Sequence, residues 1–120
     1  MNDPDWAPLT CTFAGIWELQ PQWLEENMEM VRILDVREPD EFTGPLGRIR
    51  GATLIPLGEL AHRTGELAHD RPIVAVCRAG GRSAQATAIL QQAGFERVAN
   101  LAGGMLRWRA EDHPVEGGRS

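Results

Sequence analysis

The apolar run Ile73-Val74-Ala75-Val76 constrains the fold of this chain more than any other segment. Four consecutive apolar residues suit a strand with both faces covered, as in a parallel sheet between two layers of helices. The run ends in Cys77, and a glycine-bearing loop, 78–82, leads into a helix-like segment at 83–93. This order places the cysteine at the carboxyl end of a strand, where sites in parallel sheets are found.

The rest of the chain alternates short apolar strands with helical segments. We expect strands at 16–19, 31–36, 53–55, 73–76 and 98–101, and helical segments at 21–27, 39–42, 57–67, 83–93 and 105–110. This alternation predicts an α/β protein, a three-layer α/β/α fold with a five-stranded parallel sheet. We expect one domain, 16–115, preceded by an N-terminal arm, 1–15, and followed by a short tail, 116–120, with no further helix or strand after Ala110.

The charge of the chain argues against nucleic acid and anionic membranes as partners. Its 120 residues carry twelve arginines, no lysine and seventeen acids, a net charge of −5. No apolar run approaches the roughly 20 residues that cross a bilayer. The first thirty residues contain acids but neither arginine nor lysine, unlike a signal peptide. We therefore expect a cytoplasmic protein with no nucleic-acid or membrane partner.

The cysteine and histidine content predicts neither a structural metal nor a disulfide. The two cysteines, Cys11 and Cys77, lack metal-ligand spacing, and cytosolic thiols are normally reduced. The three histidines stand singly in unrelated contexts. We expect no cofactor, and we interpret Cys11 as a partly buried bystander, because neither a glycine loop nor a helix start follows it closely.

The loop after Cys77 has the features of an anion-binding nest around a nucleophile. Gly80 and Gly81 let the backbone curl, so that several N–H groups and the helix N-terminus can point at the sulfur. Arg78 and Arg82 add positive charge, and no histidine in the loop can serve as a base. Activation of the thiolate would then be electrostatic. A buried cysteine followed by an ordinary glycine turn is the plainer interpretation, and the sequence Cys-x-x-Gly-Gly-Arg-Ser at a helix start disfavours it.

Four segments resemble, in order, the motifs of the rhodanese family of single-domain sulfurtransferases. They are Leu34–Phe42, Ile49–Leu57, Cys77–Ser83 and Leu101–Trp108. The resemblance covers the chain from about Ile16 to Val115. It implies a rhodanese-like fold for this domain.

The resemblance implies that Cys77 takes a sulfane sulfur from thiosulfate or a low-molecular-weight persulfide and becomes a persulfide. The sulfur then passes to a thiophilic acceptor such as cyanide or a thiol, in a ping-pong scheme. The expected substrate-binding residues are Arg78, Ala79, Gly80, Gly81 and Arg82, and the expected supporting residues are Asp35, Arg37 and Ser83. Two roles stay open for Arg82: it steers an anionic donor, or it locks the loop by pairing with a carboxylate. Asp35 is expected to be a structural hydrogen-bond acceptor.

Loop length separates this chain from related phosphatases and arsenate reductases. Those enzymes use a cysteine-x5-arginine loop, wide enough for a tetrahedral oxyanion, whereas Cys77 to Arg82 is cysteine-x4-arginine. Two-domain thiosulfate and mercaptopyruvate enzymes carry an arginine where Glu41 aligns, which disfavours 3-mercaptopyruvate as the donor.

Two other functions remain open from the sequence. A persulfide carrier or docking module would serve a partner protein, such as a member of a sulfur relay, instead of a free small molecule. An inactive rhodanese-like scaffold is disfavoured, because such proteins usually lack the loop cysteine.

Overall fold

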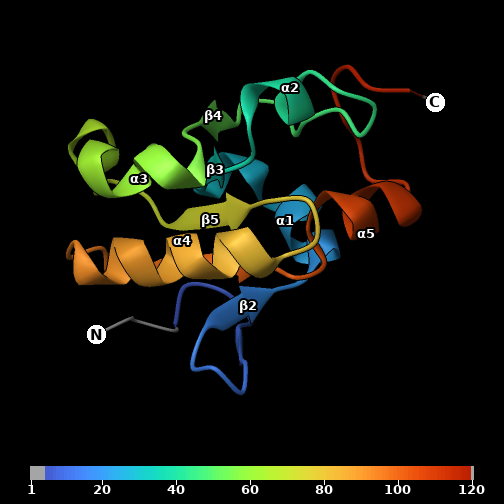
Figure 1. Ribbon diagram of the computed structural model, residues 1–120. Helices are drawn as coiled ribbons and strands as arrows, with labels where there is room; N and C mark the ends of the chain where they lie inside the picture. The colour runs from blue at the N-terminus through green and yellow to red at the C-terminus, as the bar shows by residue number, and fades with distance from the viewer. Residues whose placement is uncertain (1–4, 120) are drawn as a thin grey trace.

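Over residues 5–119, which the computed structural model describes, the chain forms a six-stranded sheet in the order β1-β2-β6-β5-β3-β4 (Figure 1). The strands are β1 Thr10–Cys11, β2 Trp17–Leu19, β3 Arg32–Asp35, β4 Thr53–Leu54, β5 Ile73–Val76 and β6 Val98–Leu101. The helices are α1 Pro21–Glu26, α2 Pro39–Phe42, α3 Leu57–Arg63, α4 Gly81–Gln92 and α5 Gly104–Ala110, and short 3₁₀ turns lie at Met28–Met30 and Thr64–Glu66.

The predicted α/β class is confirmed, and the sheet has one strand more than expected. The neighbouring pairs from β2 to β4 are all parallel, and β1 pairs antiparallel with β2. The sheet is therefore mixed. The parallel strands end on one side of the molecule, where α2, the loop after β5 and the start of α5 lie together (Figure 1).

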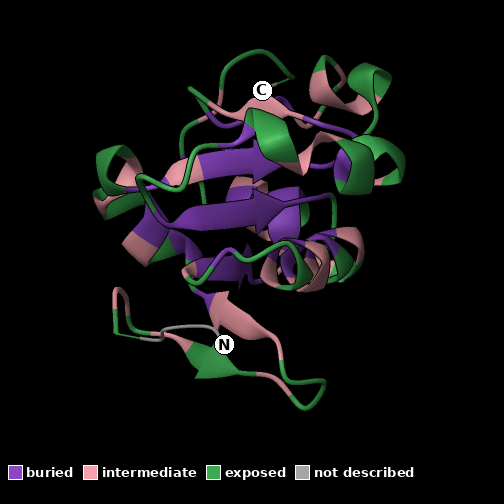
Figure 2. Cartoon of the chain, turned by 90° about the vertical axis from the view of Figure 1, so that its left-hand side faces the viewer, coloured by how far each residue is buried: buried purple, intermediate pink, exposed green. Residues whose placement is uncertain are grey.

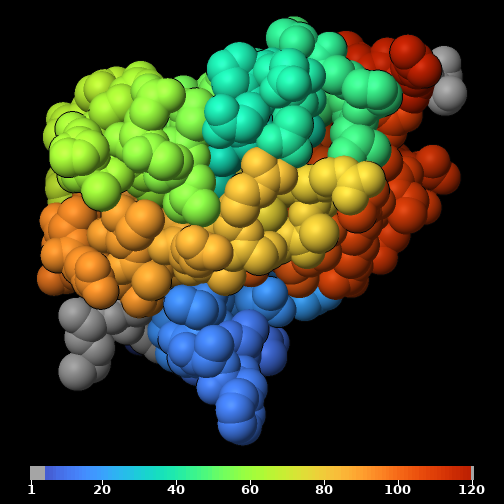
Figure 3. Space-filling model, viewed as in Figure 1, coloured from blue at the N-terminus to red at the C-terminus, as the bar shows by residue number. Residues whose placement is uncertain are grey.

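The additional strand lies in the segment expected to be an arm. Thr10 pairs with Glu18 and Cys11 with Trp17, and the turn between the strands closes with Gly15 at φ +81°. The resulting hairpin projects from the body of the molecule (Figure 3). The expectation of a partly buried Cys11 is wrong: this thiol is exposed, because it lies on a two-residue edge strand. Residues 1–4 of the expected arm lie outside the described residues.

Two core clusters cover the two faces of the sheet. Successive residues of β5 point to opposite faces, so Ile73 and Ala75 pack with α3 and α4 while Val74 and Val76 pack with α1 and α5. All four β5 residues are buried, as the continuous apolar run predicted, and the central strands form the buried middle layer in Figure 2. None of the described helices is both long enough and apolar enough to span a bilayer.

The segment after α5 packs back onto the domain. Arg48 and Glu116 exchange two backbone hydrogen bonds, of 2.9 and 2.8 Å, and the indole of Trp108 donates to the carbonyl of Pro114 at 2.7 Å. His113 is buried, and its Nδ1 lies 2.7 Å from a carboxylate oxygen of Glu25. Residues 116–119 of the expected tail are bonded to the 45–48 loop, and Ser120 lies outside the described residues.

Candidate active site

The sheet brings the two strand ends singled out from the sequence to one edge. Asp35, the last residue of β3, is in register with Val76, the last residue of β5, and Cys77 follows directly. The chain then turns through Gly80, which has φ +111° and caps the N-terminus of α4. Only glycine adopts this backbone conformation without strain. Helix α4 consequently begins at Gly81, two residues earlier than predicted, and its N-terminus faces the cysteine.

The sulfur of Cys77 lies in a cradle of hydrogen-bond donors. The backbone N–H of Gly80 donates to Sγ at 3.0 Å and the hydroxyl of Ser83 at 3.2 Å, while Cys77 is only 1% exposed. Burial by itself raises the pKa of Cys77. The Ser83 hydroxyl and the N–H groups of Ser83, Gly80 and Ala79 outweigh it and hold the pKa below the ordinary value of a thiol. The site therefore favours a thiolate nucleophile.

The N-terminus of helix α5 fixes the backbone of this cradle. The N–H of Met105 donates to the carbonyl of Cys77 at 2.8 Å, and the N–H of Leu106 donates to the carbonyl of Arg78 at 2.9 Å. Because these carbonyls are held outward by α5, the following N–H groups are free to point toward the sulfur. The contact requires Gly104, which has φ +57° and leaves no room for a Cβ.

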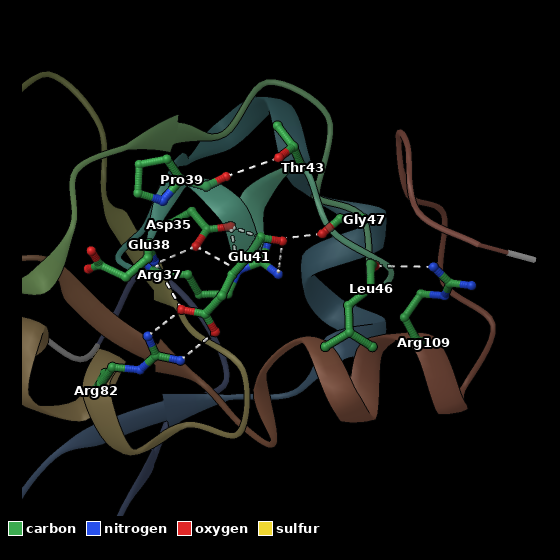
Figure 4. A network of polar contacts seen from close by, with 10 residues as sticks. All are labelled: Asp35, Arg37, Glu38, Pro39, Glu41, Thr43, Leu46, Gly47, Arg82 and Arg109. Carbon is green, nitrogen blue, oxygen red and sulfur yellow. Dashed lines mark hydrogen bonds and ion pairs between the residues drawn. The ribbon is translucent and has the colours of Figure 1, made fainter.

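Arg82 forms a bidentate ion pair with Glu41 of α2. Its Nη1 and Nη2 lie 2.6 and 2.8 Å from the two carboxylate oxygens (Figure 4). The pair joins the start of α4 to the segment after β3. Of the two roles left open for Arg82, this geometry corresponds to locking the loop.

Asp35 and Arg37 form a buried ion pair that supports α2. Arg37 Nη2 lies 2.8 Å from Asp35 Oδ2, and the side chains of Asp35 and Arg37 are 1% and 0% exposed. The guanidinium also donates to the carbonyls of Glu41, at 3.2 Å, and Gly47, at 2.9 Å (Figure 4). Asp35 is thus an acceptor, as expected. The two residues anchor the backbone of Glu41, which in turn holds Arg82.

Arg78 and Ala79 form the exposed rim of the loop. Arg78 forms no ion pair within the described chain and lines a cavity of about 340 Å³ together with Arg37, Glu41, Pro45 and Leu46. The loop meets α2 and the C-terminal region at the molecular surface (Figure 3). Arg78 is therefore available to an anion. Within residues 5–119 no three side chains of His, Cys, Asp or Glu gather as metal ligands would.

Three residues important to this geometry were not singled out as site residues from the sequence. Glu41 was considered only for donor choice, and Gly104 only as part of the Leu101–Trp108 motif. Asn100 is buried at 2% exposure beside Ser83. Its signal in the sequence is that it is the one polar residue in the strand 98–101.

Loss of the Glu41 carboxylate is expected to loosen the loop. We predict that Glu41→Gln lowers the free energy of unfolding by about 1 kcal/mol, because it removes a bidentate but partly exposed ion pair. Hydrogen bonding from Arg82 lowers the pKa of Glu41 from 4.5 to about 2. The contribution of Glu41 is then fully present above about pH 4.5 and is lost as the pH falls toward 2.

Urea unfolding of the native chain and of Glu41→Gln between pH 2 and pH 7 measures this difference. Plotted against pH, the unfolding free energies of the two proteins should converge near pH 2. Glu59→Gln, which breaks an exposed ion pair with Arg63 on α3, is the matched control and should change stability less than Glu41→Gln does at neutral pH. A difference that stays constant down to pH 2 contradicts the prediction.

Comparison with known proteins identifies the family of this chain. Residues 20–111 match the family model described as the rhodanese-like domain. A protein named sulfurtransferase from Allochromatium vinosum is 39% identical over 89 residues, which cover 74% of this chain and 81% of that protein. The thiosulfate sulfurtransferase GlpE of Pseudoalteromonas translucida is 35% identical over 84 residues, covering 70% and 78%.

Solved structures give the same result. The crystal structure of a rhodanese-related protein from Thermoplasma volcanium has a TM-score of 0.77 and 33% identity, and the match covers 82% of this chain and 96% of that one. Some matched proteins are longer: the matched region spans 23% of one curated relative and 15% of one solved chain. The family match extends over most of the chain and includes the strand ends, the cysteine loop and the start of α5. The chain therefore belongs to the rhodanese-like domain family.

Proposed function

We propose that this protein is a sulfurtransferase that moves a sulfane sulfur from a donor to an acceptor through a persulfide on Cys77. The observation that carries the proposal is the donor cradle around Sγ, formed by the Gly80 N–H and the Ser83 hydroxyl. The names of the relatives support sulfur transfer in general. The proposed donors are thiosulfate or a low-molecular-weight persulfide, and the proposed acceptors are cyanide or a thiol.

The cradle suits both halves of such a reaction. With thiosulfate, the Cys77 thiolate attacks the sulfane sulfur, the S–S bond of the donor breaks, and sulfite leaves with the electron pair. The negative charge then lies on the outer sulfur of the persulfide, where loop N–H groups and the N-terminus of α4 stabilise it. Attack by cyanide on the outer sulfur releases thiocyanate and returns the thiolate.

The surroundings of Cys77 favour a small anionic donor with a terminal sulfur. The sulfur is almost fully covered, so a slender group reaches it more easily than a branched one. Arg78, the residue after Cys77, is an exposed cation without an ion pair among the described residues, whereas Arg82 is paired with Glu41. A reducing, cytoplasmic setting suits this chemistry, because the thiolate must escape oxidation between turnovers.

Thiocyanate formation from thiosulfate and cyanide tests the proposal. We expect Cys77→Ala to abolish turnover and Cys11→Ala, which removes the exposed second thiol, to leave it unchanged. Mass spectrometry after incubation with thiosulfate alone should find one added sulfur on Cys77. Undiminished turnover in Cys77→Ala would overturn the assignment, whereas a sulfur adduct without thiocyanate turnover would identify a persulfide carrier that serves a protein partner.

A further inference from the structure

The hydroxyl of Ser83 has more acceptors around it than it has hydrogens. Its oxygen lies 3.2 Å from Cys77 Sγ and 3.3 Å from the carbonyl oxygen of Gly80, and it also contacts Asn100 Oδ1 at hydrogen-bond distance. A serine hydroxyl donates one hydrogen only. Ser83 is fully buried, so water does not supply the missing donor. The three acceptors therefore compete for a single proton.

The carbonyl of Gly80 does not need this proton. It already accepts the N–H of Ala84 at 3.1 Å and the side-chain amide of Asn100 at 3.2 Å. A carbonyl oxygen has two lone pairs, and both are used. The competition is therefore between Cys77 Sγ and Asn100 Oδ1.

The amide of Asn100 is held with its oxygen toward Ser83. Its Nδ2 donates to Glu18 Oε2 on β2, at 3.2 Å, and to the carbonyl of Gly80, also at 3.2 Å. Reversing the amide would place Oδ1 against two acceptor oxygens and leave no donor for either of them. Asn100 therefore always presents an acceptor to the Ser83 hydroxyl.

We propose that Asn100 is a positioning residue that competes with Cys77 for the hydrogen bond of the Ser83 hydroxyl. Its amide oxygen accepts that hydrogen bond whenever the sulfur of Cys77 is uncharged, and competes for it when the sulfur is a thiolate. When Cys77 is a thiol, its S–H donates to Ser83 and Ser83 donates to Asn100, so every hydrogen is used. When Cys77 is a thiolate, the hydroxyl turns to Sγ and Asn100 Oδ1 loses its donor. Asn100 thus opposes formation of the free thiolate.

The same competition favours the persulfide. Attack on the donor moves the negative charge from Sγ to the outer sulfur, so Sγ no longer needs the Ser83 proton. The Ser83 hydroxyl can then donate to Asn100 Oδ1 again, so one hydrogen bond is regained when the persulfide forms. The inference rests on the sulfur-transfer role proposed for Cys77, but its test concerns the resting thiol and does not require turnover.

Charged groups near this network come from several segments. Glu18 of β2 accepts from Asn100, and Arg82 of α4 interacts with the sulfur of Cys77, with its partner Glu41 of α2 and with Glu38. Arg78 follows Cys77 in the loop. Hydrogen bonding from Arg82 holds the pKa of Glu41 at about 2, and the pair with Glu41 raises the pKa of Arg82, so neither of these two groups changes charge in the neutral range. The exposed second thiol, Cys11, is first replaced by serine, so that the alkylation reaction reports Cys77.

The rate of alkylation by iodoacetamide as a function of pH tests the proposal in the Cys11→Ser background. Leucine is nearly equal to asparagine in shape and has no acceptor. Asn100→Leu should therefore lower the midpoint of the pH profile of Cys77 alkylation by about one pH unit, because one hydrogen bond no longer opposes the thiolate. Ser83→Ala should shift it upward. In the Ser83→Ala background, Asn100→Leu should leave the midpoint unchanged, because the hydroxyl for which Asn100 and Cys77 compete is absent.

Thr87→Val is the matched structural control. Thr87 is buried on the same helix and donates to the carbonyl of Ser83 at 2.8 Å, but its hydroxyl serves that carbonyl and not the sulfur. The Thr87→Val variant should be less stable, and its alkylation midpoint should be unchanged. An unchanged or raised midpoint in Asn100→Leu, or an equal shift with and without Ser83, would overturn the proposal. If Asn100→Leu does not fold, Asn100→Ala is used, which also removes the acceptor and should lower the midpoint with Ser83 present but not in the Ser83→Ala background.

Discussion

Replacement of Gly104 by alanine is expected to remove sulfur transfer and to lower the free energy of unfolding by about 2–4 kcal/mol. A Cβ at this position would lie 2.5 Å from the carbonyl oxygen of Cys77 and 2.7 Å from the carbonyl carbon of Arg78. Both contacts are with backbone, which has no flexible end to move aside. The residue also has φ +57°, where a side chain adds strain.

The expected loss of sulfur transfer follows from the position of the clash, at the backbone of the cysteine loop. The N–H groups of Met105 and Leu106 would be pushed away from the Cys77 and Arg78 carbonyls, so the loop N–H groups would no longer be aimed at the sulfur. Thiocyanate turnover and thermal unfolding measure the two effects. Gly58→Ala is the matched control, because a Cβ there meets nothing within 4 Å and alanine favours helix α3. Full activity in Gly104→Ala would show that α5 does not shape the cradle.

Asp35→Ala is expected to be the most destabilising single change at the ion pair below α2. It leaves the buried Arg37 guanidinium without its carboxylate, and breaking a buried pair in this way costs about 3–5 kcal/mol. Removing both charges, as in Asp35→Ala with Arg37→Met, should recover part of the loss, because no uncompensated charge remains buried.

Chemical unfolding of these variants measures the effect. Asp70→Ala is the surface counterpart, since Asp70 is 59% exposed and pairs with Arg32 across 3.3 Å; its loss should change stability far less than the loss of Asp35. Sulfur transfer should fall in Asp35→Ala because the Glu41 backbone loses its anchor. Similar stability losses for Asp35→Ala and Asp70→Ala would contradict the account of a buried support.

Local patterns in the sequence were sufficient to predict the strands and helices that build the sheet. The apolar run 73–76 is fully buried between two layers, and the helix predicted at 57–67 appears as α3 followed by a 3₁₀ turn around Gly65. The edge strand β1 was not predicted. Thr10 and Cys11 carry no strand pattern of their own and become a strand only because β2 offers an unpaired edge.

The partners of the charged residues could not be predicted for a similar reason. The sequence left open a pairing of Arg82 with a carboxylate, but its partner Glu41 lies forty-one positions away. Likewise, nothing in a run such as Val98-Ala99-Asn100-Leu101 indicates that the asparagine faces Ser83 and Glu18. Contacts between distant segments depend on how the strands are ordered, which local patterns do not encode.

The sequence by itself determined that Cys77 ends a buried strand and opens a glycine loop before a helix, because strand, turn and helix preferences act over a few neighbouring residues. Its motifs also predicted the family. Only the tertiary structure decided what holds the loop in shape: the amides at the start of α5, the Glu41–Arg82 pair and the side chain of Asn100. These groups converge because parallel strands end at one edge of the sheet, so that distant segments meet around one sulfur.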